Sequence, residues 1–512
     1  MSRSKRFLTG LLSSYVALGI NIFYTIASVP LALHYLDKEQ FGLWALVAQM
    51  SAYLGLLELG MRGSVARILS DHKDQMETGA YGSVLKTGNR IFFIQGLAVT
   101  LCGWLLAAVG APLMDLPPAL HGQFSILMAL QSTLGGIGLA LAGLGAPLWC
   151  HQRLDVSALS SSLCLILSFA VLWVGFSLGW QIYSMVAVSA VTLITGTTCI
   201  YTFCKRSGFY PSRENSGNYD PLIFRELFHF GSGLFLINLG TLMASASQVV
   251  LVSRLMGVDN AAIWSVATKL FNMAQQFVAK ILESSVGGLT EMLVRGDQSG
   301  MRDRFRDIVT LSAVMAVVAS GAIAFMNGAF VEVWTSGKIT WNAWNNLLLG
   351  CVLFSTAVNR CHIGLVGITK QIRGMKYINL LEGSLFVLFS LLLVPTTGLA
   401  GLLIAALVCN LGTAGIYGIS RTAKYFKIPS RNIIEWIARP IAVLLSILLI
   451  FCAIQWFGLA SGGPYTRLLA GGFVFGIIIP PCILLFGIDS RLRTQISSGV
   501  KRILSKERQR PA

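Results

Sequence analysis

The residues of this sequence that could carry chemistry lie inside long apolar stretches, where ionisable side chains are costly and mark functional sites by default. The richest set falls in residues 261–285. Its members are Lys269, Met273, Gln276, Lys280 and Glu283, at positions i, i+4, i+7, i+11 and i+14. This spacing predicts that they share one face of a helix. Two cations beside polar groups on one face would suit an anionic ligand such as a phosphate.

Each of these cations also has a structural interpretation. Lys269 lies about seven residues, or about 10 Å along a helix, from the outer end of its stretch, so we favour a cavity-lining role for it. Lys280 lies near the inner end of the stretch. Its side chain could equally well extend to the membrane interface and keep its charge in water. Lys280 could also simply pair with Glu283 at i, i+3.

Three more charges fall within or at the ends of apolar stretches. Arg360 and Glu382 lie in neighbouring stretches joined by the short segment 370–376. If these stretches form a hairpin, the two side chains can neutralise each other, or Arg360 can be held free for phosphate. Arg254 ends its stretch, where it stands either at the interface or at the mouth of a cavity.

Uncharged polar side chains recur at helical spacing in the first, second and seventh stretches. Such residues either contact a polar ligand or join helices inside a bundle, and the spacing leaves both open. The positions that we take as candidate binding residues are Asn21, Gln49, Asn238 and Gln248. Glu58 and Arg62, at i, i+4 near the inner end of the second stretch, are expected to form a structural or gating pair.

Composition determines which elements must position these residues. Hydrophobic residues make up 54% of the 512 residues and charged residues only 12%, about half the roughly 25% usual in soluble domains. Apolar runs of about 20 residues, long enough to cross the hydrocarbon layer as helices, recur along the whole chain. A soluble enzyme, a secreted domain and a nucleic-acid-binding module are therefore excluded.

The sequence predicts an all-α polytopic membrane protein with about fourteen transmembrane helices. Continuous apolar runs without period-2 alternation favour helices over a barrel. The predicted spans are 11–33, 41–60, 91–110, 123–146, 158–178, 182–204, 228–256, 261–285, 308–330, 344–369, 377–394, 398–420, 439–458 and 466–487. Because no loop is long enough to fold as a domain, we expect the function to reside within the membrane layer.

The net charge of +17 follows largely from membrane topology. Lys and Arg number 32 in one alternate set of loops and 4 in the other, which predicts that the first set and both termini are cytoplasmic. The basic tail is expected to lie against anionic lipid, and no nucleic acid is needed to explain the charge. The ten cysteines show no CxxC or Cys/His metal spacing. No disulfide framework, metal site or cofactor is therefore predicted.

The two halves of the sequence repeat at an offset of about 220 residues. Tyr35-Leu36 aligns with Leu255-Met256, and Arg153 aligns with Arg373. Because each repeat holds six spans, the two are expected to share one orientation and to form two lobes around a central cavity. The predicted parts are an N-terminal lobe at 1–215, a C-terminal lobe at 216–430, two extra helices at 431–490 and the tail at 491–512.

Three short motifs stand in a characteristic order and position. They are Tyr35-Leu36 with Phe41-Gly42-Leu43-Trp44, Leu57-Glu58-Leu59-Gly60-Met61 with Arg67 six residues on, and Gln152-Arg153. In these motifs, its spans and its duplication, the chain resembles the oligosaccharide flippases of bacterial polysaccharide synthesis over residues 7–487. These are the O-antigen translocase type of the multidrug/oligosaccharidyl-lipid/polysaccharide exporter superfamily. One departure is Glu58, which stands where an Asp is common in such proteins.

The resemblance implies a carrier that moves an undecaprenyl-diphosphate-linked oligosaccharide from the cytoplasmic to the periplasmic leaflet of the bacterial inner membrane by alternating access. It implies a cavity between the lobes that holds the sugar and diphosphate while the polyprenyl tail stays in lipid. Lipid-linked oligosaccharide, membrane lipids and polysaccharide polymerase machinery are the implied partners. The in-span charges of the C-terminal lobe all align with uncharged residues of the other lobe. We therefore expect the C-terminal lobe to contact the diphosphate and the N-terminal lobe to contact the sugars.

Two other functions are alternatives. A cation-coupled multidrug exporter of the same superfamily would be expected to carry carboxylates deep in its spans, whereas Glu58, Glu283 and Glu382 all lie near inner ends. A membrane polysaccharide polymerase or ligase would present a sizeable outward loop with acid–base residues. The outward connections here run to about a dozen residues or fewer and hold no nucleophile–base pair, so no catalytic residue is assigned and an enzyme is not expected.

Overall fold

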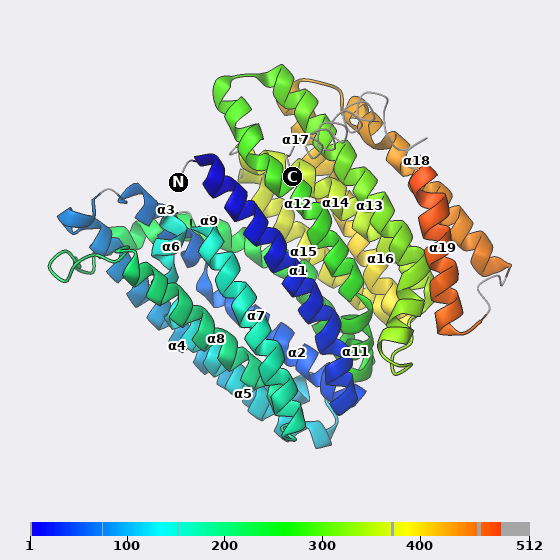
Figure 1. The fold of residues 1–512 in the computed structure, drawn as a ribbon, viewed down its shortest axis with the longest axis horizontal. Helices are drawn as coiled ribbons and strands as arrows, with labels where there is room; N and C mark the ends of the chain where they lie inside the picture. Colours follow the sequence, from blue (N-terminus) through cyan, green and yellow to red (C-terminus); the bar gives the residue numbers. More distant parts are fainter. Residues whose placement is uncertain (1–2, 74, 152, 370–372, 458–461, 483–512) are drawn as a thin grey trace, which may run out of the picture. The chain divides into compact units, whose positions relative to one another are not determined.

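The computed structural model describes residues 3–73, 75–151, 153–369, 373–457 and 462–482. Helices make up most of this part of the chain, and no strand occurs among these residues (Figure 1). The predicted all-α class is confirmed. Gln152 of the third motif and the basic tail at 491–512 lie outside the described residues.

Contacts within the chain divide it into two compact units, residues 1–266 (unit 1) and 267–512 (unit 2). The helices up to the boundary are α1 (Arg3–Tyr35), α2 (Lys38–Leu54), α3 (Met61–Asp71), α4 (Ala80–Leu113), α5 (Pro118–Ala140), α6 (Ala146–Cys150), α7 (Leu154–Ser177), α8 (Tyr183–Arg206), α9 (Pro221–Ser245), α10 (Ser247–Met256) and α11 (Val258–Ala267). Those that follow are α12 (Lys269–Arg295), α13 (Gln298–Trp334), α14 (Ala343–Ile368), α15 (Arg373–Thr397), α16 (Leu399–Asn410), α17 (Ile416–Phe426), α18 (Ser430–Trp456) and α19 (Pro464–Cys482).

Twelve helical segments of the described chain are long and apolar enough to cross a membrane. They coincide with twelve of the fourteen predicted spans. Of the other two, 261–285 is interrupted at Thr268, and 466–487 runs past the last described residue. The multi-pass organisation is confirmed, and the total of fourteen stays a prediction.

Helix pairing repeats between the units, as a duplication predicts. In unit 1, α4 packs on α5 and α7 on α8, and in unit 2, α13 packs on α14 and α15 on α16. The seventh span departs from the repeat, because α1 packs on α7 whereas α9 packs on α3 and α4. These contacts group α9 and α10 with unit 1, although the repeat assigns them to the lobe at 216–430. The lobe boundaries drawn from the repeat stay a prediction.

Glycines let α4 and α5 touch through their backbones. A Cβ atom added at Gly96 would lie 2.4 Å from the carbonyl oxygen of Gly136, and one added at Gly136 would lie 2.5 Å from the carbonyl oxygen of Gly96. Small residues at such crossings let membrane helices gain van der Waals contact that lipid cannot supply. The tight α4–α5 pair is therefore the framework of unit 1.

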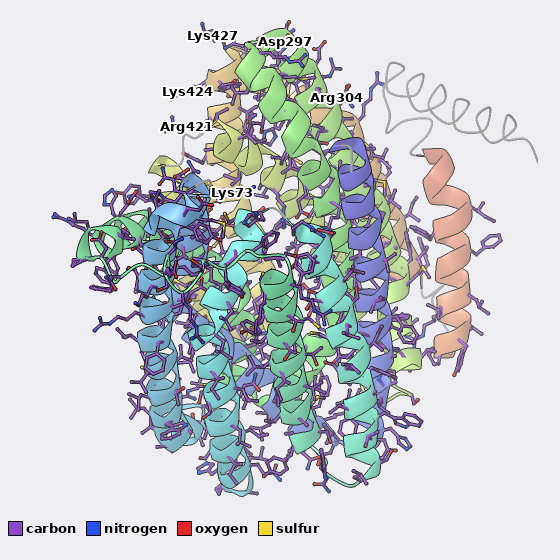
Figure 2. The ribbon with its side chains drawn as sticks, turned by 60° about the vertical axis from the view of Figure 1, so that its left-hand side comes forward. Lys73, Asp297, Arg304, Arg421, Lys424 and Lys427 are labelled. Atoms are coloured by element: carbon purple, nitrogen blue, oxygen red, sulfur yellow. The ribbon has the colours of Figure 1, made fainter. Side chains whose placement is uncertain are left out.

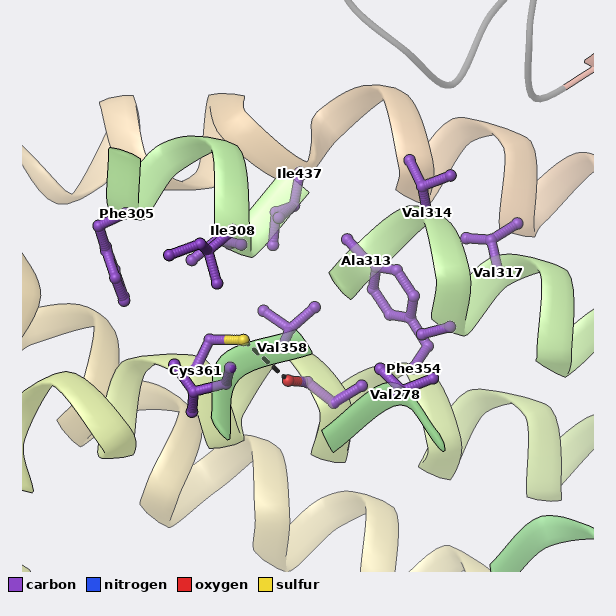
Figure 3. Close-up of a cluster of buried hydrophobic side chains, with 14 of the residues drawn as sticks. Val278, Phe305, Ile308, Ala313, Val314, Val317, Phe354, Val358, Cys361 and Ile437 are labelled. Carbon is purple, nitrogen blue, oxygen red and sulfur yellow. Dashed lines mark hydrogen bonds between the residues drawn. The ribbon is translucent and has the colours of Figure 1, made fainter. Parts of the chain in front are cut away.

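Helix α13 is the central helix of unit 2 and contacts α12, α14, α18 and α19. Its side chains Ile308 and Val314 belong to a buried cluster that includes Phe354 and Val358 of α14 and Ile437 of α18 (Figure 3). Packing of this density leaves little freedom for helix displacement. It fixes α12 and α14, the helices that carry the charged candidates Lys269, Lys280, Glu283 and Arg360.

An ordered connection links α8 to α9 within unit 1. The hydroxyl of Tyr81 donates to the carbonyl oxygen of Phe209 at 3.0 Å, and Lys86 Nζ donates to the carbonyl oxygen of Gly217 at 3.0 Å. Tyr210 also lies in this connection, and its partial burial raises the pKa of its phenol. The segment 207–220 therefore lies as a strap along the start of α4.

Replacing Gly136 with leucine is expected to destabilise unit 1, because the new side chain must push α5 away from α4. Overpacking of this kind costs about 1–3 kcal/mol and should lower the unfolding midpoint of the detergent-solubilised protein. Gly122→Leu in the same helix is the matched control, since a Cβ atom there meets nothing within 4 Å. Equal loss of stability in the two variants would contradict the close α4–α5 approach.

Candidate functional site

An ion-pair cluster joins α12 to α14 in unit 2. Lys280 Nζ lies 2.6 Å from Glu283 Oε2, and Arg360 Nη2 lies 3.2 Å from Glu283 Oε1. The ion pair between Lys280 and Glu283, one of the alternatives that the spacing left open, is present. The pairing considered between Arg360 and Glu382 is wrong, because Glu283 takes that place. We call Lys280, Glu283 and Arg360 the charged cluster.

The charged cluster is half exposed and carries a net positive charge. Its side chains are 43%, 44% and 55% exposed in the order Lys280, Glu283 and Arg360. Ion pairs this exposed typically contribute about 0–1 kcal/mol to stability, so the cluster is not what holds the helices together. Two cations share one carboxylate, which leaves positive charge available for an anion.

Lys269 is the first residue of α12 and follows the interruption at Thr268. Its side chain is partly exposed and forms an ion pair with no described residue, unlike the cations of the cluster. Asn272 and Gln276 are exposed on the same helix. By contrast, Gln275 donates to Thr356 Oγ1 of α14 at 3.1 Å and so joins two helices. The predicted polar face of α12 is therefore present.

The polar stripe of α9 is exposed within unit 1. Asn238, Thr241 and Ser245 are all exposed, and the two hydroxyls donate to carbonyls four residues back in their own helix at 2.9 Å. These side chains do not join helices, so the packing interpretation does not hold for them. Gln248 of α10 is partly buried and donates to the carbonyl oxygen of Ala244 at 2.9 Å.

The two remaining polar candidates of unit 1 lie on α1 and α2. Asn21 and Gln49 are partly exposed, and neither side chain makes a hydrogen bond to another residue in the described part of the chain. The carbonyl oxygen of Asn21 accepts from Thr25 Oγ1 at 2.8 Å, a contact within α1. Both amide side chains therefore keep their donors and acceptors available.

The predicted pair of Glu58 and Arg62 is confirmed and has a clear structural role. Arg62 Nε lies 3.3 Å from Glu58 Oε2, and the backbone N–H of Arg62 donates to Glu58 Oε1 at 3.0 Å. The chain turns between them through Leu59 and Gly60, whose φ angles are 53° and 73°. Glu58 therefore caps the first turn of α3, where a carboxylate is favoured by the helix dipole.

Two other basic candidates also have structural partners. Arg254 pairs with Asp115 from the connection between α4 and α5, both side chains being well exposed, which supports the interfacial interpretation of Arg254. Arg153 makes two hydrogen bonds to Asp155, with Nε–Oδ1 at 3.0 Å and Nη2–Oδ2 at 2.9 Å. These hydrogen bonds to the carboxylate raise the pKa of Arg153. The arginine of the third motif thus fixes the start of α7.

Glu382 of α15 lies in a network of buried amides. Asn410 Nδ2 donates to Glu382 Oε1 at 3.0 Å, and Asn359 Nδ2 donates to Asn410 Oδ1 at 2.8 Å. Asn410 is followed by a π-helical turn, Leu411–Gly415, a form that is common at functional sites. Sequence reasoning missed both asparagines. The signal that could have found them was an amide inside an otherwise apolar stretch.

Basic residues gather at one end of the helices of unit 2. Arg304 of α13, Arg421 and Lys424 of α17, and Lys427 all lie at this end (Figure 2). The guanidinium of Arg421 lies 5.3 Å from the ring centroid of Tyr417. Cations concentrated at one end of a helix bundle are typical of the cytoplasmic face of a membrane protein.

Comparisons with known proteins agree with this architecture. Residues 152–344, fewer than half of the chain, match a family described as polysaccharide biosynthesis protein. The inward-facing conformation of a multidrug resistance MATE family transporter of the MOP superfamily is similar, with a TM-score of 0.65 at 12% identity over 79% of this chain and 95% of that one. The lipid II flippase MurJ in an inward closed conformation gives a TM-score of 0.60 at 11% identity over 89% of this chain and 100% of that one. No curated protein matches the sequence.

Replacing Asn410 with leucine is expected to destabilise unit 2, because it removes the donor to the partly buried Glu382 carboxylate. An unsatisfied buried group costs about 1–3 kcal/mol, and more when it is charged, so the thermal unfolding midpoint should fall. The double variant Asn410→Leu/Glu382→Leu should recover part of that loss, since both polar partners are then replaced by apolar groups. A double variant less stable than Asn410→Leu alone would contradict the network.

Proposed function

We propose that this protein is a flippase for a lipid-linked oligosaccharide. It moves an undecaprenyl-diphosphate-linked oligosaccharide from the cytoplasmic to the periplasmic leaflet of the bacterial inner membrane by alternating access, for cell-surface polysaccharide synthesis of the O-antigen kind. The fold that it shares with MATE transporters and with MurJ supports a transport role. The match of residues 152–344 to a polysaccharide biosynthesis family supports an oligosaccharide cargo.

The observation that carries the proposal is the cationic polar face of α12 and α14. Charged side chains on apolar helices face either a partner or water. Lys280, Glu283 and Arg360 are half exposed, and Lys269 is partly exposed and pairs with no described residue. A diphosphate is an anion that a planar guanidinium and flexible ammonium groups bind well. We assign Lys269, Lys280 and Arg360 to the diphosphate, with Gln276 beside them.

The sugar contacts are assigned to unit 1. Exposed Asn238, Thr241 and Ser245 present an amide and two hydroxyls along one helix, and the amides of Asn21 and Gln49 keep free hydrogen-bonding capacity. Neutral donors and acceptors of this kind can replace the water molecules that hydrogen-bond to sugar hydroxyls, and they bind the sugar only weakly. We therefore assign the diphosphate to the charged side chains of unit 2 and the sugars to neutral polar side chains of unit 1.

The proposed setting follows from the same charges. We place both termini and the basic end of unit 2 in the cytoplasm, with membrane lipids around the helices and polysaccharide polymerase machinery as the partner that uses the flipped product. The asymmetry of basic residues between alternate loops supports this orientation. No step of this cycle requires bond chemistry, so we do not propose an enzyme.

A cation-coupled multidrug exporter is the second candidate. It is favoured by the likeness to a multidrug resistance MATE family transporter and by Glu382, an in-span carboxylate held in a buried amide network. The polysaccharide biosynthesis match and the net positive charge of the α12–α14 face favour the flippase.

A strain that lacks this protein is expected to accumulate lipid-linked oligosaccharide on the cytoplasmic leaflet. Complementation with Lys269→Ala should restore translocation to less than about a tenth of the wild-type rate. The variant keeps the fold but lacks the ammonium group that we assign to the diphosphate. Lys38→Ala, which removes an exposed cation at the start of α2, is the matched control. Drug hypersensitivity with normal surface glycan would support the exporter instead, and full activity of Lys269→Ala would refute the assigned role.

Opposite effects are expected within the charged cluster. Glu283→Gln releases Lys280 and Arg360 from their shared carboxylate and should tighten binding of a diphosphate headgroup, whereas Arg360→Ala should weaken it. The measurement is the binding of undecaprenyl diphosphate to the purified protein, at low and at high salt. If both variants weaken binding equally, the cluster does not act as the anion site.

A further inference from the structure

We infer that Asn327 is a positioning residue, which holds the interruption between α11 and α12 and so fixes Lys269 at the start of α12. The inference rests on the proposed function for the role of Lys269 as a ligand of the anionic headgroup. The structural part, that a side chain of α13 stabilises a break in a neighbouring helix, stands on contacts within unit 2.

The interruption leaves a backbone carbonyl that needs a donor. Helix α11 ends at Ala267, and Thr268 adopts φ −89° and ψ 2° before α12 begins at Lys269. The last carbonyl groups of a helix have no partner in its hydrogen-bond ladder. In an apolar layer such a group costs several kcal/mol unless another donor reaches it. Asn327 Nδ2 donates to the carbonyl oxygen of Ala267 at 3.1 Å.

The orientation of the Asn327 amide is forced by its neighbours. Indole Nε1–H can only donate, so the bond of 2.8 Å from Trp341 Nε1 identifies its partner on Asn346 as the acceptor Oδ1. Asn327 Nδ2 lies 2.9 Å from the same oxygen and must therefore donate to it. Its second N–H is left for the carbonyl of Ala267. A flipped amide would set Asn327 Oδ1 against two acceptor oxygens.

The hydrogen-bonded side chains of Trp341, Asn346 and Asn327 form what we call the relay. All three are buried, and burying polar groups lowers stability unless their hydrogen bonds compensate. Asn327 is 0% exposed, and Asn346 and Trp341 are 2% and 8% exposed. Asn327 Oδ1 accepts no hydrogen bond from the described residues. A buried amide with an unsatisfied oxygen is destabilising compared with an apolar side chain. The bond to Ala267 is the contribution that an apolar residue at this position could not make.

The consequence for the site is positional. A helix start carries a partial positive charge of about half a unit, and interrupted helices in transporters direct such ends at anionic groups. Lys269 adds its ammonium group at this same end of α12. If α11 and α12 were one continuous helix, Lys269 would lie in its middle, away from any helix start, and its backbone would have a different direction. Asn327 thus acts on the ligand through Lys269 without contacting it.

The test measures the interruption and transport separately. Spin labels at the exposed positions 272 of α12 and 344 of α14, both in unit 2, report by pulsed electron resonance where the start of α12 lies in a cysteine-free protein. Asn327→Leu should shift or broaden the inter-label distance, and Asn345→Leu, which removes a neighbouring buried amide, should not. Trp341→Phe, which removes the first donor of the relay and keeps the ring, should give a smaller shift in the same direction.

The transport measurement uses the lipid-linked oligosaccharide in proteoliposomes. Asn327→Leu should raise KM about tenfold with a smaller change in kcat, as expected for lost positioning of a binding group. The effects of Asn327→Leu and Lys269→Ala should not add, because the first acts through the second. An unchanged inter-label distance, or effects that add fully, would overturn the inference. If Lys269→Ala alone retains full transport, the headgroup assignment fails, and the inter-label distance then decides whether Asn327 holds the interruption.

Discussion

A polar group inside an apolar helix bundle must find a partner or water, because lipid provides no hydrogen bond. Much of this structure follows from that constraint. The carbonyl of Ala267 is met by Asn327, the carboxylate of Glu382 by Asn410, and the hydroxyls of Thr241 and Ser245 by carbonyls of their own helix. These contacts satisfy polar groups within the helix bundles, and the exposed charges of α12 and α14 remain our candidates for contact with a ligand.

The exposed charges form a contrast with that buried order. Lys280, Glu283 and Arg360 make pairs that are half exposed and too weak to determine the fold, and Lys269 pairs with no described residue. Such side chains lose little free energy when contacts with a ligand replace their contacts with water or with one another. The carrier that we propose would require this property, because cargo bound too tightly would not be released on the other side.

Helix pairs with similar packing recur in the two units, as the expected duplication predicts. The helix pairs α4–α5 and α13–α14 recur with close packing, the first through Gly96 and Gly136 and the second through the apolar cluster around α13 (Figure 3). Rigid helix pairs hold polar side chains in place more accurately than loops do. Most polar candidates lie on other helices of each unit, the neutral ones of unit 1 on α1, α2, α9 and α10 and most of the cations of unit 2's candidate face on α12.

The sequence by itself determined the helical membrane class, twelve of the spans and the pair Glu58–Arg62, and it offered the pair Lys280–Glu283 as one alternative. These features are local, since apolar length and spacings of three or four residues act through a single helix. Only the tertiary structure decided that Arg360 meets Glu283, that Glu382 meets Asn410, and that Asn327 reaches the carbonyl of Ala267. These contacts depend on which helix faces which and at what depth, and the spacing of residues along one helix does not encode its neighbours.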